Sequence, residues 1–326
     1  MESVRRVVQE KGFGHLIGER VFLHQKSFEE ALPSLLEDVK GRGYTIFVLD
    51  QYGYTAVPFE QLATIFSTLN KPEIILTFNY DQLVTWVQQY DRVNRALTKL
   101  GVGAIRREEY EKSVRDGQRE FFIQRVLHRA FLTIASYFTP FFVMSRGSNM
   151  AYWLVHLSSH ARAKHVMQRL HWELSNPFCH FSGVGYNMLG YDPNNAPAGS
   201  QAYLFDDKAL DRALYQMQGD LPPLVYAYGE GVQLWKFFAS TANDAPVDAD
   251  VLKQAVISLA EIGAIEILTP LGGEKRSVTS LKLDDIIRVP RQTTLLLPGR
   301  HRPLFARQLN VLVGPPPPKK PKAPEA

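Results

Sequence analysis

An acidic and an aromatic side chain lie close together directly after an apolar run of β-prone residues. They are Asp50 and Tyr52 in the tetrapeptide Asp50-Gln51-Tyr52-Gly53, and the run covers residues 44–49. A nearly continuous run of this kind predicts a strand that is buried on both faces, as in a parallel sheet. Open α/β sheets bind ligands beyond the carboxyl ends of their strands. In that position the Asp50 carboxylate can accept hydrogen bonds from a substrate amine, and the Tyr52 ring can stack on an extruded base.

The same tetrapeptide also has a purely structural interpretation. Asp50 can cap the turn or the helix that follows, and Tyr52 can cover the edge of the sheet. Residue type alone leaves both interpretations open.

The segment after this turn completes a strand–helix–strand unit. Residues 59–69 have the apolar spacing of a helix, Asn70-Lys71-Pro72 breaks that helix, and residues 73–78 form the next apolar run. A strand, a crossover helix and a second strand at this spacing predict a βαβ unit with parallel strands. We therefore expect an α/β fold with a Rossmann-like sheet.

Cofactor loops, metal centres and catalytic nucleophiles are all disfavoured by the sequence. Gly12-Phe13-Gly14 is the early glycine pair that could form a cofactor loop, but no apolar strand precedes it, which favours a helix terminus. The histidines form no His-Glu-x-x-His pattern, so we expect no metal site. Cys179 has only His180 beside it, and no Gly-x-Ser-x-Gly elbow occurs, which argues against a nucleophilic hydrolase.

The rest of residues 1–200 fits one α/β domain. Ser27 is a suitable N-cap for a helix that reaches about Lys40. Alternation over residues 152–158 indicates an antiparallel strand at the edge of a mixed sheet. The other expected elements are a strand at 20–24, charged helices over 81–117, a strand at 141–144, a helix at 160–174 and a long loop at 176–198.

A second unit is expected over residues 201–295. Helices are predicted at 231–239 and 248–262, and two strands at 265–268 and 277–281 flank a Gly272-Gly273 turn. Helix, glycine and hairpin in this order are typical of a winged helix, whose tip would present Lys275 and Arg276 to a phosphate backbone. Residues 314–326 are rich in proline and lysine and are predicted to be a disordered tail.

Composition sets outer limits on the function. The formal charge of +4 permits a polyanionic partner but does not require one. A single cysteine rules out an intramolecular disulfide and suits a reducing cytosol, so we expect a cytoplasmic protein. The longest apolar run, at 132–144, is too short to span a bilayer, and residues 1–6 lack the apolar core of a signal peptide, so no membrane partner is expected.

With these motifs in place, the sequence resembles the three-Cys-motif partner (TcmP) family. The resemblance rests on residues 47–53, on Val57-Pro58-Phe59, on residues 74–79 and on the helix at 160–172. It implies a class I methyltransferase-type sheet with a C-terminal winged helix, and a radical-type three-cysteine protein as a partner. It also implies a first strand with a glycine turn for S-adenosylmethionine. We expect this chain to begin after that strand, so that its sheet is N-terminally shortened, and Gln51 replaces a proline of the family pattern.

Three functions follow from these observations. The first is a methyltransferase-like partner protein without a complete cofactor loop, which binds another protein, nucleic acid, or both. The second is an S-adenosylmethionine-dependent methyltransferase that acts on a nucleic-acid amine through Asp50 and Tyr52, with the cofactor loop supplied from elsewhere. The third is a winged-helix regulator that binds DNA.

Overall fold

The protein is a mixed α/β chain. The computed structural model describes residues 2–51, 53, 56–80, 83, 89–144, 151–174, 178–180, 203–204, 207–244, 247–275 and 277–290. Met1–Val289 forms one compact unit, which contains two hydrophobic clusters. The division at residue 200 stays a prediction, and the tail at 314–326 and most of the loop at 176–198 lie outside the described residues. Among the described helices, none is long and apolar enough to cross a membrane.

The predicted strand–helix–strand unit is confirmed. Strand β1 (Tyr44–Asp50), helix α3 (Phe59–Thr68) and strand β2 (Lys71–Phe78) follow one another, and β1 pairs with β2 in parallel. The register runs from Tyr44 opposite Lys71 to Asp50 opposite Thr77. Asp50 therefore ends β1 at the carboxyl edge of this parallel pair.

The expectation that β1 is buried on both faces is wrong. The strand order is β1-β2-β4-β3-β5-β6, so β1 lies at the edge of the described sheet. One face of β1 contributes Leu49 and Phe47 to the core, whereas Tyr44, Ile46 and Val48 on the other face are 74%, 61% and 72% exposed. An apolar run predicts a strand, but it does not reveal which face a neighbouring element covers.

Strand β4 (Ala151–Ser158) lies inside the sheet rather than at the predicted edge. It is antiparallel both to β2 and to β3 (Tyr137–Met144), which starts before Pro140 and is longer than expected. This reversal puts the carboxyl end of β4 beside the amino end of β2, with Ser158 opposite Glu73. Two short strands, β5 (Phe178–His180) and β6 (Tyr203–Leu204), complete the sheet.

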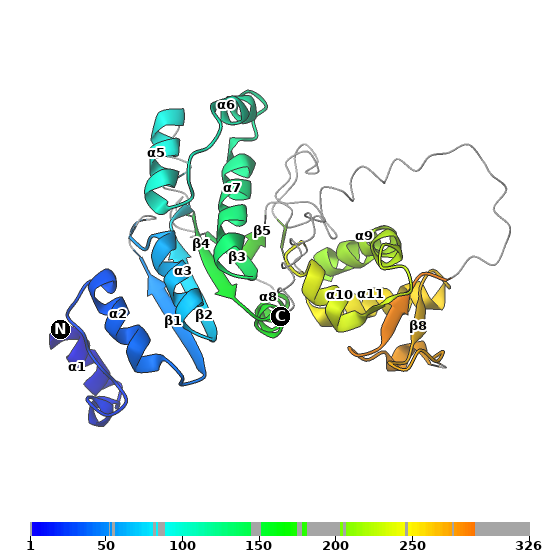
Figure 1. Ribbon diagram of the computed structural model, residues 1–326, viewed down its shortest axis with the longest axis horizontal. Helices are drawn as coiled ribbons and strands as arrows, with labels where there is room; N and C mark the ends of the chain where they lie inside the picture. The colour runs from blue at the N-terminus through cyan, green and yellow to red at the C-terminus, as the bar shows by residue number, and fades with distance from the viewer. Residues whose placement is uncertain are drawn as a thin grey trace, which may run out of the picture. The chain divides into compact units, whose positions relative to one another are not determined.

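Helices α3 and α7 (Arg119–Ile134) cover one face of the sheet (Figure 1). Their apolar residues share the first cluster with β2 and β4, and the Phe59 and Phe131 rings lie 4.6 Å apart. Helix α2 (Phe28–Val39) adds Leu32 and Leu36, and its predicted Ser27 cap is confirmed by a capping box with Glu30. The remaining helical elements before β3 are α1 (Glu2–Glu10), η1 (Gly14–Leu16), α5 (Tyr90–Leu100) and α6 (Arg107–Arg115). The strand expected at 20–24 is not formed; an isolated bridge between Ile17 and Val21 occurs there instead.

The second cluster is built from helices and a small antiparallel sheet. Helix α11 is confirmed with Asp248 as its N-cap, and the Gly272-Gly273 turn is also present. The predicted partner strand is wrong, because residues 278–280 form a 3-10 turn and β8 pairs with a later strand. The elements are α9 (Asp207–Tyr226), β7 (Val232–Gln233), α10 (Leu234–Thr241), α11 (Ala249–Glu261), β8 (Glu266–Leu268), η2 (Val278–Ser280) and β9 (Ile286–Arg288).

Hydrogen bonds from side chains to backbone groups connect the start of β3 to the second cluster. The Asn243 amide accepts from the Phe138 N–H at 3.2 Å and donates to the Ser136 carbonyl at 2.8 Å. From helix α8 (Ala161–Leu174), the Lys164 ammonium donates to the Phe138 carbonyl at 2.6 Å. Lys164 is fully buried, and burial lowers its pKa to about 7. The negative charge of the nearby Asp244 carboxylate raises this pKa and so partly offsets the effect of burial.

This buried lysine makes stability depend on pH in alkaline solution. Between about pH 7 and 10.5 the unfolded chain binds a proton that the folded chain does not, so the free energy of unfolding rises with pH. We predict that Lys164→Met flattens this rise in denaturant titrations at several pH values, whereas Lys40→Met, at an exposed lysine, preserves it. An unchanged slope in Lys164→Met would show that Lys164 is not the group that titrates.

Candidate functional site

The turn after β1 is fixed by Gln51. Its side chain is 7% exposed, and its Oε1 accepts a hydrogen bond from the Val57 N–H at 2.9 Å. Asp50 is exposed, and Tyr52 lies outside the described residues. The N-cap of α3 is Pro58 rather than Asp50, so the interpretation of Asp50 as the cap of this helix does not hold. Gln51 therefore closes the turn, while the Asp50 carboxylate remains open to solvent.

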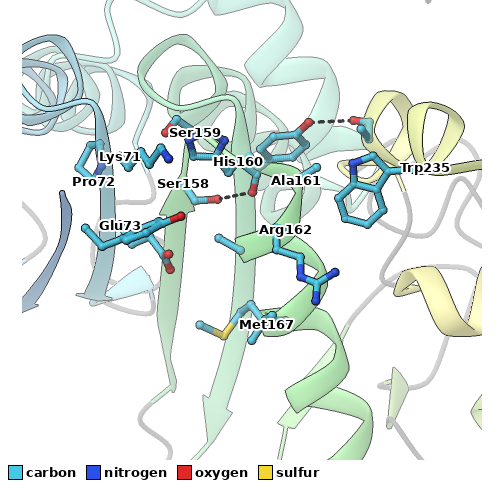
Figure 2. A pocket seen from close by; sticks show the side chains of 15 residues that line it. Lys71, Pro72, Glu73, Ser158, Ser159, His160, Ala161, Arg162, Met167 and Trp235 are labelled. Atoms are coloured by element: carbon cyan, nitrogen blue, oxygen red, sulfur yellow. Dashed lines mark hydrogen bonds between the residues drawn. The ribbon is translucent and has the colours of Figure 1, made fainter. Parts of the chain in front are cut away.

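A cleft of about 580 Å³ lies at the opposite end of β1 and β2. Its wall includes Tyr44 and Lys71, the first residues of the two strands, and the segment from Ser158 to Ala163 that joins β4 to α8. Figure 2 shows Lys71 and Glu73 on one side and Trp235 of α10 on the other, with the start of α8 between them. The cleft thus exists because β4 runs antiparallel to β2, so that α8, which follows β4, begins beside the amino ends of β1 and β2.

The cleft contains the first turn of α8. The His160 carbonyl accepts from the N–H groups of Ala163 and Lys164 at 3.1 and 3.3 Å, so the helix begins at this point. The first N–H groups of a helix have no partner within the helix and carry a partial positive charge. Ala161 and Arg162, which supply these groups, both line the cleft. The backbone therefore favours an anion here.

Charged side chains give the cleft the same preference. Lys71, His160 and Arg162 are basic, and the Lys71 ammonium lies 5.1 Å above the Tyr44 ring. Glu73 is the acidic residue of the wall, and its carboxylate lies 3.0 Å from His156 Nε2. The hydrogen bond from His156 lowers the Glu73 pKa, so this carboxylate is ionised at neutral pH. Its charge is thus engaged by a buried histidine, and the basic groups dominate the opening.

Aromatic side chains complete the wall. They are Tyr44, Tyr137 and Trp235, from β1, β3 and α10. The Tyr137 hydroxyl donates to the Ala239 carbonyl at 3.2 Å, and burial raises its pKa, so it remains a neutral phenol. Trp235 packs at 5.3 Å from the Phe238 ring, which holds it at the cleft. Cations and aromatic rings together suit a ligand with phosphate groups and flat bases.

A histidine and two aspartates near the cleft form a helix cap rather than a metal centre. His165, Asp248 and Asp250 place their ligand atoms within 4.8 Å of one another. However, Asp248 Oδ1 accepts from the N–H groups of Asp250 and Val251, and His165 Nδ1 accepts from the Ala249 N–H at 3.2 Å. The cluster thus binds the amino end of α11, where the helix dipole opposes a cation.

The residues predicted at the tip of the wing occupy different settings. The Lys275 ammonium is ion-paired with Asp285, whose side chain is 2% exposed. Asp285 also accepts from the Lys282 N–H at 2.6 Å, so the pair joins the turn to the approach to β9. Arg276 lies outside the described residues. The Lys275 charge is compensated inside the fold, which weakens the prediction that it contacts phosphate.

No protein-family model, curated protein or solved structure matches this chain. The resemblance to three-Cys-motif partner proteins therefore stays a prediction. The cleft must be interpreted from its own chemistry.

The sequence prediction placed the site at Asp50 and missed this cleft. The cleft joins β1, β2, β3, β4, α8 and α10, several of which are far apart in the sequence. A local signal did exist, because Ser158-Ser159-His160-Ala161-Arg162 is a polar, partly basic stretch between an apolar strand and a helix. Such a junction is a common place for an anion-binding helix start.

We predict that the Lys275–Asp285 pair stabilises the fold and does not bind nucleic acid. Lys275→Met leaves the Asp285 carboxylate buried without its cation, and we expect a loss of about 3 kcal/mol of unfolding free energy. Denaturant titration measures this loss, and an oligonucleotide titration of the same variant should match the wild type. A weakened oligonucleotide affinity with unchanged stability would instead support the wing interpretation.

Proposed function

We propose that this chain is a three-Cys-motif partner-like protein that binds single-stranded nucleic acid in the cleft at the start of α8. The observation that supports this proposal best is that basic and aromatic side chains surround the amino end of one helix. The basic residues are Lys71, His160 and Arg162, and the aromatic residues are Tyr44, Tyr137 and Trp235. A methyltransferase-like sheet then serves as a binding scaffold. A three-cysteine-motif protein is the partner that the family resemblance implies.

The element order supports the proposed ancestry of the fold. The parallel unit β1–α3–β2, with Asp50 at the end of β1, is compatible with a Rossmann-like, methyltransferase-type sheet. In the second cluster, a helix, a strand, two helices and two strands follow in sequence, and the sheet order is β7-β9-β8. That succession is the one expected for a winged helix. Both assignments are proposals that rest on topology.

The chemistry of the cleft favours a single strand over a duplex. Single-strand sites combine a basic groove with aromatic platforms, and each stacked base contributes roughly 1–3 kcal/mol. The cleft has both features within one concave wall. Helix α11, by contrast, carries Asp250 and Glu261 with Lys253, a charge pattern that is poor for a major groove.

Charge reversal in the cleft tests this function. Arg162 is exposed, so Arg162→Glu is compatible with folding, and we expect about tenfold weaker binding of a uridine-rich oligonucleotide at ~0.1 M salt. The slope of log affinity against log salt should also fall by about 0.7 for each phosphate that the variant no longer neutralises. Fluorescence anisotropy at several salt concentrations provides both quantities.

Arg169→Glu is the matched control for this experiment. Arg169 lies on the same helix, is exposed and pairs with Glu173 at 2.7 Å, but it does not line the cleft. Equal losses of affinity in the two variants would indicate a general effect of net charge. An unchanged affinity in Arg162→Glu would remove the cleft from the proposal.

Methyl transfer to a nucleic-acid amine is the second candidate, and the exposure of Asp50 at the carboxyl end of β1 favours it. The described residues of this turn do not fit a cofactor loop for S-adenosylmethionine. The Gln51 side chain accepts a hydrogen bond from the Val57 N–H, and the positive-φ glycines next to β1, Gly41 and Gly43, lie at the other end of the strand. Asp50→Ala separates the candidates, because it removes the hydrogen-bond acceptor: it abolishes methylation in the second candidate and leaves oligonucleotide affinity unchanged in the first.

A further inference from the structure

The sheet has an apolar face on β1 that the described part of the chain leaves open. We name Tyr44, Ile46 and Val48 the open face; their exposed fractions are 74%, 61% and 72%. Parallel strands in α/β proteins are normally covered on both faces, because a helix packs on each. Here the opposite face of β1 and β2 is packed in the first cluster, whereas the open face retains three large apolar side chains in water. The element expected to cover the open face is an amphipathic helix, which would pack its apolar stripe on these three side chains.

Among the described elements, α1 (Glu2–Glu10) is an amphipathic helix that has no buried residue. Its Val4 and Val7 are each 49% exposed. Val4, Val7 and Val8 have the i, i+3, i+4 spacing that forms one stripe on a helix. A helix of nine residues is marginal in water unless such a stripe is packed. Its principal neighbour within the chain is the short η1 turn.

The two surfaces match in length and in charge. Helix α1 is roughly 13 Å long at 1.5 Å per residue, and Tyr44 to Val48 also spans roughly 13 Å along the strand. Asp50 lies on the same face of β1 as Tyr44, Ile46 and Val48, because alternate strand residues share a face. Arg5 borders the stripe of α1, whereas Arg6 is engaged with Glu10 at 3.7 Å. A basic residue beside the valine stripe thus complements the carboxylate at the end of the open face.

We infer that α1 of one copy of this chain covers the open face of a second copy, and that the second copy returns the contact. Because the second copy returns the contact, the exchange has two-fold symmetry and closes after two subunits, whereas an unreturned contact would continue as a ring or a filament. Burying six apolar side chains in each of two contacts removes about 1,200 Å² from water, the lower range of specific interfaces. Tyr44 belongs both to the open face and to the wall of the cleft, whereas Ile46, Val48 and α1 do not line the cleft. The dimer therefore goes beyond the proposed function and does not depend on it.

Sedimentation of the full chain tests the exchange. We expect a reversible dimer, with twice the mass of the 37.0 kDa chain, over micromolar concentrations. Val7→Asp on α1 and Ile46→Lys on the open face should each weaken dimerisation by at least about tenfold. Both positions are exposed in the single chain, so circular dichroism should stay near the wild type, and the melting temperature should match that of the wild type at concentrations where it is monomeric. Leu271→Lys, at a 98% exposed leucine elsewhere, is the matched control and should remain dimeric.

Cysteine pairing separates a second copy from other occupants of the face. With Cys179→Ser as the background, a Val7→Cys chain mixed with an Ile46→Cys chain should give a disulfide-linked dimer that neither chain gives alone. A monomer at all concentrations would overturn the inference, as would a disulfide formed only within one Val7→Cys, Ile46→Cys chain. Dimers that persist in both Val7→Asp and Ile46→Lys would overturn it too, because the interface would then lie elsewhere. Oligonucleotide binding by a monomeric chain would leave the proposed function standing.

Discussion

The antiparallel pairing of β4 with β2 is the constraint on which the candidate site depends. Because Ser158 lies opposite Glu73, the strand that leads into α8 ends beside the amino end of β2. The first turn of α8 therefore meets Lys71 and Tyr44 rather than Asp50. An all-parallel sheet would have brought the helix start and Asp50 to the same edge. The direction of one central strand thus separates the exposed carboxylate from the basic, aromatic cleft.

The cleft also depends on how β3 is held. Asn243 satisfies backbone groups of Ser136 and Phe138, and Tyr137 between them donates to the Ala239 carbonyl. These bonds connect the sheet to α10, the helix that carries Trp235. Lys164 strengthens the same junction, although desolvation of its ammonium opposes this. A buried lysine at this place is understandable, because it binds a carbonyl that the β3 ladder does not use.

Local patterns were sufficient for much of the fold. Residues 44–49 predicted β1, Ser27 predicted the start of α2, and the pattern over residues 248–262 predicted α11, since each depends on neighbours in the sequence. The errors concern distant contacts. The open face of β1, the interior position of β4 and the pairing of β8 with β9 are set by elements that no short window contains. The candidate site belongs to the second group, because the cleft is assembled from six separate elements.

Photo-crosslinking is the most direct test that nucleic acid binds in the cleft. A uridine-rich oligonucleotide with a photoreactive base would be irradiated on the full chain, and the attached peptides identified by mass spectrometry. We expect attachment at Tyr137, Trp235 or Tyr44, and its loss when Arg162 is replaced by Glu. Attachment confined to the turn after Asp50, or to the Gly272-Gly273 turn, would show that nucleic acid does not bind in the cleft.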